Sequence, residues 1–380
     1  MKPQDSDTAG GPLFIIAGGG TAGHVMPGLA VAQAIVDAGH PKERIHFIGA
    51  RRGMEATMVP AAGFSVSLFD VRGIARSLSP SNLPAFYNLT AGIRRADRLF
   101  RRIEPSVVVS VGGYASVPAV MAAKIQRIPV LVVSYDMVPG KASRLAARLA
   151  TASAVAFESS PLPRKVVTGV PLRPEILAVD RHRDRARARD QLGLPPDRFT
   201  VVVVGGSLGS GTLNRVTRAL VDARRDDGDL AIHHVYGTRN DDEAWERLDA
   251  PGGLVYHPVP FEDRMDLAYA AADLVVARAG ATTVAELAAL GVPSILVPWP
   301  QAAEDHQTAN ARALAAVGGA VLVPEPELDA DTLGRELDRL RADPAALAAL
   351  SSGGRSIGRR GAAAAIARLA EELAMGVPDD

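Results

Sequence analysis

The sequence predicts an α/β protein of two doubly wound Rossmann-like domains, each built around a parallel sheet. Short apolar runs rich in β-branched residues alternate with alanine-rich helical runs. The pattern of strand, glycine loop and helix that opens near Phe14 restarts near Val201. The length of 380 residues also exceeds what one ordinary core holds. Continuous apolar strands between helices are typical of parallel sheets, which bind ligands at the carboxyl ends of their strands.

The predicted strands form two series, separated by a proline-rich segment and a highly charged one. We therefore expect the domains to join near Val170–Glu175 and to face each other across a ligand-binding cleft. The last helix has no strand after it and is expected to pack across this joint. The expected segments are 12–172, 173–350 and 351–376. The expected strands are Leu13–Ala17, Ile45–Ile48, Val107–Val111, Val130–Val133, Ala154–Phe157, Val201–Val204, Ala231–Val235, Leu274–Ala277 and Ser294–Val297.

The composition argues against several classes of protein. Lys+Arg and Asp+Glu balance at 42 each, so no nucleic-acid partner is expected. The absence of cysteine excludes disulfides, thiolate metal sites and a cysteine nucleophile. The N-terminus lacks the apolar core of a signal peptide, and no apolar run reaches the ~18 residues that span a bilayer. We therefore expect a cytoplasmic protein, which could still lie on a membrane surface.

The first glycine loop lies in "FIIAGGGTAGHVMPG". Its Gly18-x-Gly20-x-x-Gly23 pattern is that of dinucleotide-binding loops, which direct backbone N–H groups and a helix N-terminus at a phosphate. NAD binding also needs an acidic residue where the second strand ends, and this chain has Arg51 and Arg52 there. NAD is therefore disfavoured, although the arginines leave NADP open. The chain has no Walker A motif, which excludes a P-loop ATPase.

His24 follows this loop directly, and a second glycine loop, Gly112–Tyr114, follows another apolar strand. The His24 ring is expected to project into the cleft beside a bound anion, the alternative being a ring turned to solvent. Two loops rich in N–H groups on one rim of the N-terminal domain suit a diphosphate. The alternative for the second loop is a tight turn that needs glycine for its backbone alone.

The segment Leu274–Trp299 carries the most informative pattern of the second domain. A strand ends at Arg278, a loop of small residues follows, and a helix opens near Thr282 and Thr283. Thr283-x-x-Glu286 is a capping box, so one interpretation makes Glu286 a cap of its own helix. The other makes it a carboxylate that accepts both hydroxyls of a ribose, with the helix end facing nucleotide phosphates.

Polar residues also stand at the start of the next predicted helix. Asp305, His306, Gln307 and Asn310 offer donors and acceptors that suit sugar hydroxyls. The alternative is a polar helix cap made by Glu304 or Asp305.

A basic segment, Phe69–Arg102, holds seven arginines; between the first of them, Arg72, and the last, Arg102, Asp97 is the single acidic residue, and apolar residues are interleaved. On a protein of zero net charge, such a patch predicts an element that lies on anionic lipid. The alternative is a solvated helix face above an ordinary core stripe.

Together these segments resemble one family, the MurG glycosyltransferases of glycosyltransferase family 28, which add N-acetylglucosamine to lipid I to make lipid II. Each segment is weak alone, but they occur in family order from Phe14 to about Pro324. The resemblance implies a GT-B fold with UDP-N-acetylglucosamine held mainly by the C-terminal domain. The segments are "GGGTAGHVMPGLAVA", "GGYASVPA", "GVPLRPEI", "GGSLGSGTLN", "RAGATTVAELAALGVPSILVPWP" and "DHQTANARAL".

Matching positions imply the site residues. Glu286 would bind the ribose, Arg173 would lie near the donor, and the two N-terminal glycine loops would face the acceptor diphosphate and the transferred sugar. The implied donor residues are Thr21, Ala22, Gly23, Arg173, Ser207, Arg278, Ala281, Thr282, Thr283, Val284, Ala285, Glu286, His306 and Gln307. The implied acceptor residues are Gly19, Gly20, Gly112, Gly113 and Tyr114.

Three positions depart from the family pattern. Where the family usually reads His-Glu-x-Asn, this chain reads "SYDM", which puts Met137 in place of the asparagine. Leu208 stands where glutamine is usual, and Val170 where asparagine is usual. Each change removes a side-chain amide, which predicts altered substrate preference or weakened activity.

The implied reaction is one in-line displacement with inversion, in which the muramyl 4-hydroxyl of lipid I attacks and UDP leaves. A helix N-terminus, loop amides and Arg278 would stabilise the charge of the leaving group, so no cofactor and no strict metal requirement are expected. His24 is the expected general base, and Asp136 is the second candidate.

The expected partners are UDP-N-acetylglucosamine, lipid I, the anionic inner-membrane surface, and other cell-wall and division proteins. The expected location is peripheral, on the cytoplasmic face of the cell membrane. The alternatives are a GT-B transferase with another lipid or glycan acceptor, and a catalytically weakened homologue that serves as a UDP-sugar or lipid-binding scaffold. An NADP oxidoreductase is a distant third.

Overall fold

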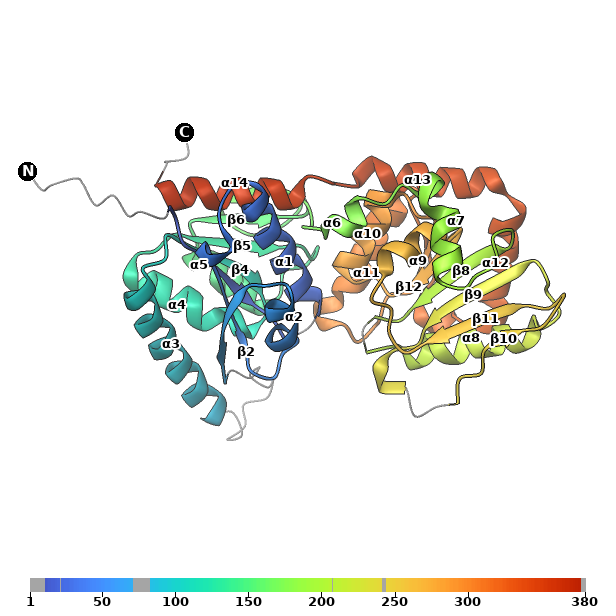
Figure 1. Ribbon diagram of the computed structural model, residues 1–380, viewed down its shortest axis with the longest axis horizontal. Helices are drawn as coiled ribbons and strands as arrows, with labels where there is room; N and C mark the ends of the chain where they lie inside the picture. The colour runs from blue at the N-terminus through green and yellow to red at the C-terminus, as the bar shows by residue number, and fades with distance from the viewer. Residues whose placement is uncertain (1–10, 21, 71–82, 207, 241–243, 377–380) are drawn as a thin grey trace, which may run out of the picture. The chain divides into compact units, whose positions relative to one another are not determined.

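The computed structural model describes residues 11–20, 22–70, 83–206, 208–240 and 244–376. The chain divides into two compact units. Residues 1–173 and 361–380 form the first, and residues 174–360 form the second. Each unit contains its own sheet with helices packed on it (Figure 1).

The first unit contains a seven-stranded parallel sheet in the order β3-β2-β1-β4-β5-β6-β7. β1 pairs with β4, with Phe14 opposite Val107, and the strand order reverses there. Ligands of doubly wound sheets bind at such a reversal, outside the carboxyl ends of the strands. The strands are β1 (Phe14–Gly18), β2 (Ile45–Ala50), β3 (Ser65–Phe69), β4 (Val107–Gly112), β5 (Val130–Ser134), β6 (Ala152–Val155) and β7 (Lys165–Val167).

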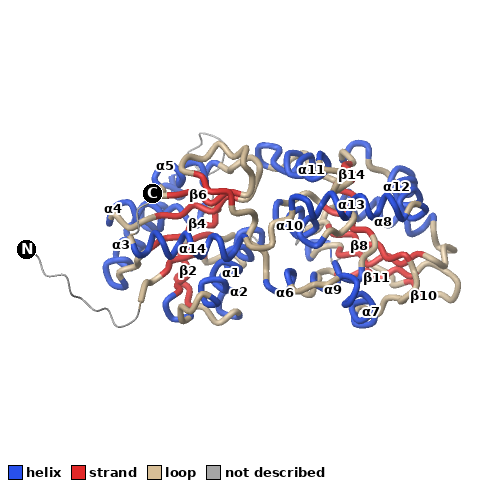
Figure 2. Tube along the Cα trace, turned by 90° about the horizontal axis from the view of Figure 1, so that it is seen from above, coloured by secondary structure: helices blue, strands red, loops and turns tan. Residues whose placement is uncertain are grey.

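Helices cover both faces of this sheet (Figures 1 and 2). α3, α4 and α5 bury small and branched side chains against one face, while α1 and α14 pack side by side against β1, β4 and β5. His40, after α1, bonds Glu371 of α14 at 2.8 Å. The helices are α1 (Ala22–Asp37), α2 (Glu55–Ala61), α3 (Leu83–Ile103), α4 (Val117–Gln126), α5 (Lys141–Leu149) and α14 (Ala362–Met375), with short 3-10 turns η1 (Lys42–Arg44) and η3 (Tyr114–Ser116).

The second unit repeats this plan with the order β10-β11-β9-β8-β12-β13-β14, parallel except for the β10–β11 pair. Successive valines of β8 point to opposite faces of the sheet. Val201 and Val203 belong to one core cluster, and Val202 belongs to the other. The strand order reverses between β8 and β12. The strands are β8 (Phe199–Val204), β9 (Leu230–Val235), β10 (Leu248–Asp249), β11 (Val255–Val259), β12 (Leu274–Ala277), β13 (Ser294–Leu296) and β14 (Val321–Leu322).

The helices of the second unit also form two layers. α8, α12 and α13 contribute leucines and valines to one core cluster, while α6, α9, α10 and α11 contribute to the other. Their bounds are α6 (Pro174–Leu177), α7 (Arg181–Gln191), α8 (Gly211–Ala223), α9 (Met265–Ala271), α10 (Ala281–Leu290), α11 (His306–Ala316), α12 (Ala330–Ala342) and α13 (Pro344–Ile357), with the 3-10 turns η4 (Thr238–Asn240), η5 (Ala303–Asp305) and η6 (Glu325–Glu327).

The predicted fold class is confirmed, and the nine expected strands are present to within two residues at each end. The prediction missed β3, β7, β10, β11 and β14. These strands are short or interrupted by polar residues and proline, as in "SVSLF" of β3 and "VYHPV" of β11. Their apolar pattern is therefore too weak to stand out from loops.

The expectation of one final helix over 351–376 is wrong. α13 ends at Ile357, and a break precedes α14 at Ala362. A Cβ on Gly358 would lie 2.7 Å from the Ala288 carbonyl oxygen of α10, so this close approach requires glycine. The break separates the two units, because residues 174–360 belong to the second unit and α14 packs in the first.

Candidate functional site

The carboxyl ends of β1 and β4 bring the two predicted glycine loops of the first unit together. A Cβ added to Gly113 would lie 2.6 Å from the carbonyl oxygen of Gly19, so the backbones of the two loops touch. Gly112 and Gly113 have φ values of 95° and 77°, a region that favours glycine. The backbone conformation of a tight turn therefore explains why glycine is needed at Gly112 and Gly113. The contact with Gly19 shows that this turn lies against the first glycine loop.

His24 lies against the second glycine loop. A Cβ on Gly112 would lie 3.2 Å from its ring, and one on Gly113 would lie 3.3 Å from it. The half-buried ring therefore faces the loop rather than open solvent. Its Nδ1 is 2.6 Å from the hydroxyl oxygen of Tyr135, which follows β5. Three consecutive strand ends, those of β1, β4 and β5, thus meet at His24.

Tyr135 is a site residue that the sequence analysis did not single out. Its side chain is 5% exposed, and its hydroxyl donates to the carbonyl oxygen of Gly23 at 2.7 Å, with that of Val111 at 3.2 Å. Burial, with a smaller contribution from Asp136, raises the pKa of Tyr135 well above its ordinary value. The phenol therefore stays protonated. The only sequence signal was its place in the departing segment "SYDM".

Glu55 is the second residue that was missed, and it corrects the expectation that no carboxylate follows the second strand. Its buried carboxylate accepts from the backbone N–H of Gly20 at 2.8 Å and from that of Ala50 at 2.5 Å. Cβ atoms on Gly19 or Gly53 would collide with it. Glu55 therefore occupies the inside of the first glycine loop and uses the Gly20 amide, so this amide is not directed at an anion.

The second unit presents two helix N-termini at its own strand reversal. Ser210 caps α8, accepting from the Leu213 N–H at 3.4 Å. α10 follows Gly280, and no side chain of the described residues caps it. Uncapped N–H groups at a helix N-terminus, with the positive end of the helix dipole, form a binding site for phosphate. The arrangement therefore favours α10 as the anion site.

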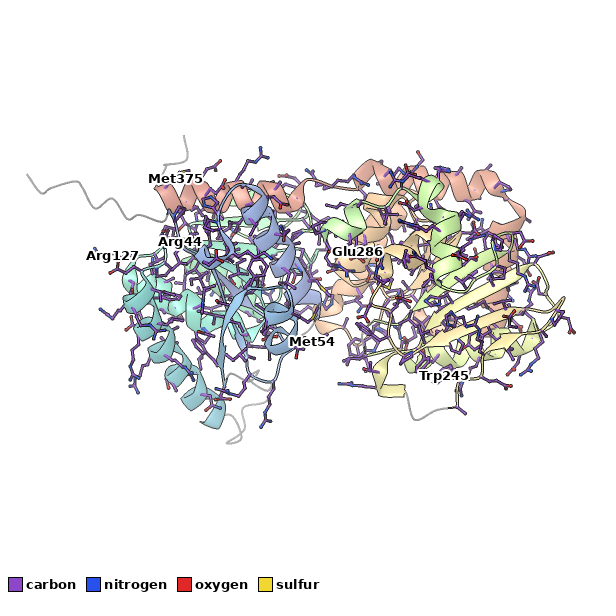
Figure 3. All side chains as sticks on the ribbon, in the orientation of Figure 1. Arg44, Met54, Arg127, Trp245, Glu286 and Met375 are labelled. Atoms are coloured by element: carbon purple, nitrogen blue, oxygen red, sulfur yellow. The ribbon has the colours of Figure 1, made fainter. Side chains whose placement is uncertain are left out.

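The capping box predicted at Thr283 is wrong. α10 begins at Ala281, so Thr283 is already the third helical residue and Glu286 lies in the second turn. Figure 3 labels Glu286. Glu286 is 5% exposed and accepts a hydrogen bond from the hydroxyl of Tyr269 on α9 at 2.8 Å. Tyr269 was not predicted, because "LAYAA" reads as ordinary core. The first of the two interpretations of Glu286 is thus excluded by geometry.

Arg278 is buried and already bonded. Its guanidinium donates to the carbonyl of Val297 at 3.1 Å and to the hydroxyl of Ser210 at 2.7 Å, and it pairs with Glu325. These partners lie on the loops that follow β13, β8 and β14. Arg278 therefore joins the loops at the carboxyl edge of this sheet, a positioning role that the sequence did not indicate.

The loop before α11 has an unusual backbone. Glu304 and Asp305 have φ values of 56° and 53°, which L-residues adopt rarely. Asp305 occupies the N-cap position but accepts from no backbone N–H of the helix, so the alternative of a helix cap does not hold for Asp305; its carboxylate accepts from the hydroxyl of Thr308 at 2.6 Å. The side chain of Gln307 turns back and accepts from the backbone N–H of Trp299 at 2.9 Å. Half-buried His306 opens the helix beside it.

The remaining predicted residues are placed as follows. Thr21 and Ser207 lie outside the described residues. Arg173 ends the first unit and is half-buried, whereas Tyr114 is 41% exposed. Asp136 is half-buried directly after Tyr135. Ala22 and Gly23 open α1, and Ala281, Thr282, Val284 and Ala285 lie on the first turns of α10.

The three departures from the family pattern have different surroundings. Val170 is buried and Leu208 is 46% exposed. The sulfur of half-buried Met137 accepts a hydrogen bond from the Ser159 hydroxyl at 3.1 Å.

The basic segment is in part outside the described residues, namely at 71–82, and the rest forms α3. From position 88 onward, its arginines are exposed while Ala96, Leu99 and Phe100 are buried. The core-stripe alternative therefore explains the apolar residues of this part. Within the described residues, no helix is both long enough and apolar enough to cross a membrane.

Comparison with known sequences matches both units. The N-terminal domain model of glycosyltransferase family 28 matches residues 14–155, and the C-terminal domain model of this family matches residues 200–367. A UDP-N-acetylglucosamine--N-acetylmuramyl-(pentapeptide) pyrophosphoryl-undecaprenol N-acetylglucosamine transferase from Desulforudis audaxviator is 38% identical over 95% of this chain and 98% of its own. The protein of the same name from Clavibacter sepedonicus is 39% identical over 96% and 98%.

Solved structures agree with the sequence comparison. The crystal structure of Acinetobacter baumannii MurG has a TM-score of 0.72 and 26% identity, covering 95% of this chain and 99% of that one. A Staphylococcus aureus MnaA–UDP complex has a TM-score of 0.66 at 12% identity, covering 97% and 99%, and shows likeness of fold alone. The chain therefore belongs to glycosyltransferase family 28 and, within it, to the MurG family that the sequence motifs resembled.

Proposed function

We propose that this chain is the inverting glycosyltransferase that moves N-acetylglucosamine from UDP-N-acetylglucosamine to the muramyl 4-hydroxyl of lipid I, forming lipid II for peptidoglycan. The relatives that carry this activity in their names match the chain over nearly its whole length. The observation that carries the proposal is the meeting of both glycine loops at His24, on the strand reversal of the first unit. A transferase needs its acceptor-activating group at such a place.

The donor is assigned to the second unit. The uncapped N-terminus of α10 is directed at the diphosphate of the donor, where its N–H groups and dipole stabilise the negative charge that grows as UDP leaves. Glu286 accepts the ribose hydroxyls, and Tyr269 holds its carboxylate in place. Gln307 and His306 lie toward the sugar. Arg278 contributes by holding the surrounding loops.

The acceptor is assigned to the first unit, where the loop Gly112–Tyr114 receives the diphosphate of lipid I. His24 takes the proton from the attacking hydroxyl, and the new bond forms at the anomeric carbon as the bond to UDP breaks, with inversion. Asp136 is the second candidate for this base. Because the amides and helix dipole already stabilise the leaving group, the proposal includes no strict metal requirement.

The proposed setting is the cytoplasmic face of the cell membrane. Exposed arginines of α3 are directed at anionic lipid headgroups, which would bring the enzyme to its lipid-linked acceptor. Contacts with other cell-wall and division proteins, and a role in cell shape and division, belong to the same proposal.

One second candidate has a specific observation in its favour. The replacement of amide-bearing family residues by Val170, Leu208 and Met137 favours a related transferase that uses another lipid or glycan acceptor.

The decisive experiment combines purified protein, UDP-N-acetylglucosamine and a short-chain lipid I analogue, and measures UDP release. UDP that appears only when lipid I is present supports the proposal. Release with a different polyprenyl-linked acceptor but not with lipid I supports the second candidate. Release without any acceptor indicates hydrolysis or epimerisation. No release in any arm, with UDP-sugar binding retained, indicates a scaffold and contradicts the proposal.

A further inference from the structure

The hydrogen bonds around Tyr135 determine which nitrogen of His24 carries its proton. The Tyr135 hydroxyl has one proton, and three acceptor or donor atoms surround it. Two are the carbonyl oxygens of Gly23 and Val111, at 2.7 and 3.2 Å, and the third is the Nδ1 atom of His24 at 2.6 Å. Carbonyl oxygens only accept, so they cannot both face the lone pairs of the hydroxyl. The hydroxyl proton therefore goes to a carbonyl, and Nδ1 must donate.

Pro27 explains why the Gly23 carbonyl needs this proton. Pro27 lies within α1, four residues after Gly23, and proline has no N–H to donate to the carbonyl of residue i−4. The helix therefore leaves the Gly23 oxygen without its regular partner, although a backbone carbonyl of a folded protein normally accepts a hydrogen bond. The Tyr135 hydroxyl supplies the missing donor.

From these contacts we infer that Tyr135 is a positioning residue that holds neutral His24 in the Nδ1–H tautomer, leaving the lone pair on Nε2 to accept the proton of the attacking hydroxyl. Tyr135 touches neither substrate in this scheme. The part about the attacking hydroxyl rests on the proposed function. The tautomer itself rests on the hydrogen bonds alone.

The second unit contains a histidine, His234, that serves as a matched control because its hydrogen bonds predict the opposite tautomer. The Nδ1 atom of His234 lies 2.8 Å from the Tyr256 hydroxyl, and its Nε2 lies 3.1 Å from Oδ1 of Asn214. The amide nitrogen of Asn214 donates to the Tyr236 carbonyl at 3.0 Å, which forces Oδ1 toward the ring. His234 therefore carries its proton on Nε2, and its Nδ1 accepts from Tyr256.

The test is ¹⁵N NMR of the histidine rings in the full chain, at a pH well above the ordinary histidine pKa of about 6.5. Protonated and unprotonated ring nitrogens have widely separated shifts, and couplings to the ring protons identify each nitrogen. Signals of His24 and His234 are assigned by their loss in His24→Ala and His234→Ala. The same measurement is then made on Tyr135→Phe and, as the matched control, on Tyr256→Phe.

We expect wild-type His24 to be protonated on Nδ1 and His234 on Nε2. Tyr135→Phe should move His24 toward the Nε2–H form and lower kcat about tenfold to a hundredfold, less than loss of the base itself, with KM for UDP-N-acetylglucosamine nearly unchanged. Tyr256→Phe should leave both tautomers unchanged, because Asn214 still accepts from His234.

A wild-type His24 protonated on Nε2 would overturn the inference. The spectrum of the wild-type protein therefore tests the inference even if Tyr135→Phe fails to fold. An unchanged tautomer in folded Tyr135→Phe would overturn it as well. The proposed function fails separately: a protein with His24 protonated on Nδ1 that transfers nothing to lipid I contradicts the function and leaves the tautomer standing.

Discussion

A hydrogen-bonded histidine–tyrosine pair lies in each unit, His24–Tyr135 in the first and His234–Tyr256 in the second, and the two pairs differ in almost every property that matters for function. His24 and Tyr135 lie at the carboxyl ends of strands, with the His24 ring half-buried against a glycine loop. His234 lies inside β9 with no exposed surface, and Tyr256 lies in the neighbouring strand β11. A histidine–tyrosine hydrogen bond thus occurs both in the candidate site at the carboxyl ends of the strands and in a hydrogen-bond network inside the core.

The difference teaches that burial separates a structural histidine from one suited to proton transfer: the His24 ring is half-buried, whereas His234 has no exposed surface. Both ring nitrogens of His234 have protein partners. Burial, and then the neighbours His233 and Arg218, lower the pKa of His234 to about 3, so it stays neutral at any physiological pH. A histidine in this state stabilises the core and exchanges no proton. The predictions below test whether the two pairs divide their roles in this way.

The largest effect is expected for His24→Ala. Loss of the general base should lower kcat for lipid I by about 100- to 10,000-fold, because positioned proton transfer contributes about that much. Steady-state UDP release measures kcat, and thermal unfolding checks that the fold is retained. Asp136→Asn is the companion variant. Full turnover by His24→Ala, with loss in Asp136→Asn, would transfer the role to Asp136.

The second effect is the dependence of the free energy of unfolding on pH, through His234 of the His234–Tyr256 pair in the core. His234 has a folded-state pKa of about 3 against an ordinary value of 6.5, so the unfolded chain binds a proton between these values that the folded chain does not. The stability that comes from neutral His234 is complete above pH 6.5 and is lost as the pH falls toward 3, by at most about 5 kcal/mol.

Denaturant unfolding of wild type and His234→Gln at several pH values checks this. The difference in the free energy of unfolding between the two proteins should shrink as the pH falls from 6.5 to 4. His182→Gln, which replaces an exposed histidine, is the matched surface variant. A constant difference for His234→Gln would contradict the assignment of a neutral core histidine.

A smaller effect is expected for the third partnered tyrosine, Tyr269. Tyr269→Phe removes the hydroxyl that donates to Glu286, and a hydrogen bond to a charged group is worth about 1.5–3 kcal/mol. Part of that loss should appear as a rise of about fivefold to twentyfold in KM for UDP-N-acetylglucosamine, with kcat less affected. If KM stays constant, Glu286 does not need Tyr269 to bind the donor.

The smallest effect is expected for Tyr256→Phe. It leaves Nδ1 of His234 without a donor and should lower the free energy of unfolding by about 1 kcal/mol, since a net hydrogen bond is worth about that much. Transfer activity should remain at the wild-type level, whereas Tyr135→Phe lowers it. Equal losses of activity in the two variants would remove the distinction between the site pair and the core pair.

The sequence by itself determined the fold class, the nine predicted strands and the position of His24 directly after the first glycine loop. These follow from local patterns: apolar strands, glycine loops at strand ends, and the order in which they occur. The family resemblance rests on the same local segments. Each of these signals lies within a few residues of the feature that it predicts. Such signals can therefore be recognised in the sequence without knowledge of the tertiary structure.

Only the tertiary structure decided what each polar group binds. Glu55 reaches Gly20 across 35 positions, Tyr135 reaches His24 across 111, and Arg278 reaches Ser210 across 68. The capping box at Thr283 was wrong because α10 begins at Ala281, so its N-cap is Gly280 and not Thr283. A hydrogen bond depends on distances of a few tenths of an ångström between atoms far apart in the chain, and these distances exist only after the sheets have formed.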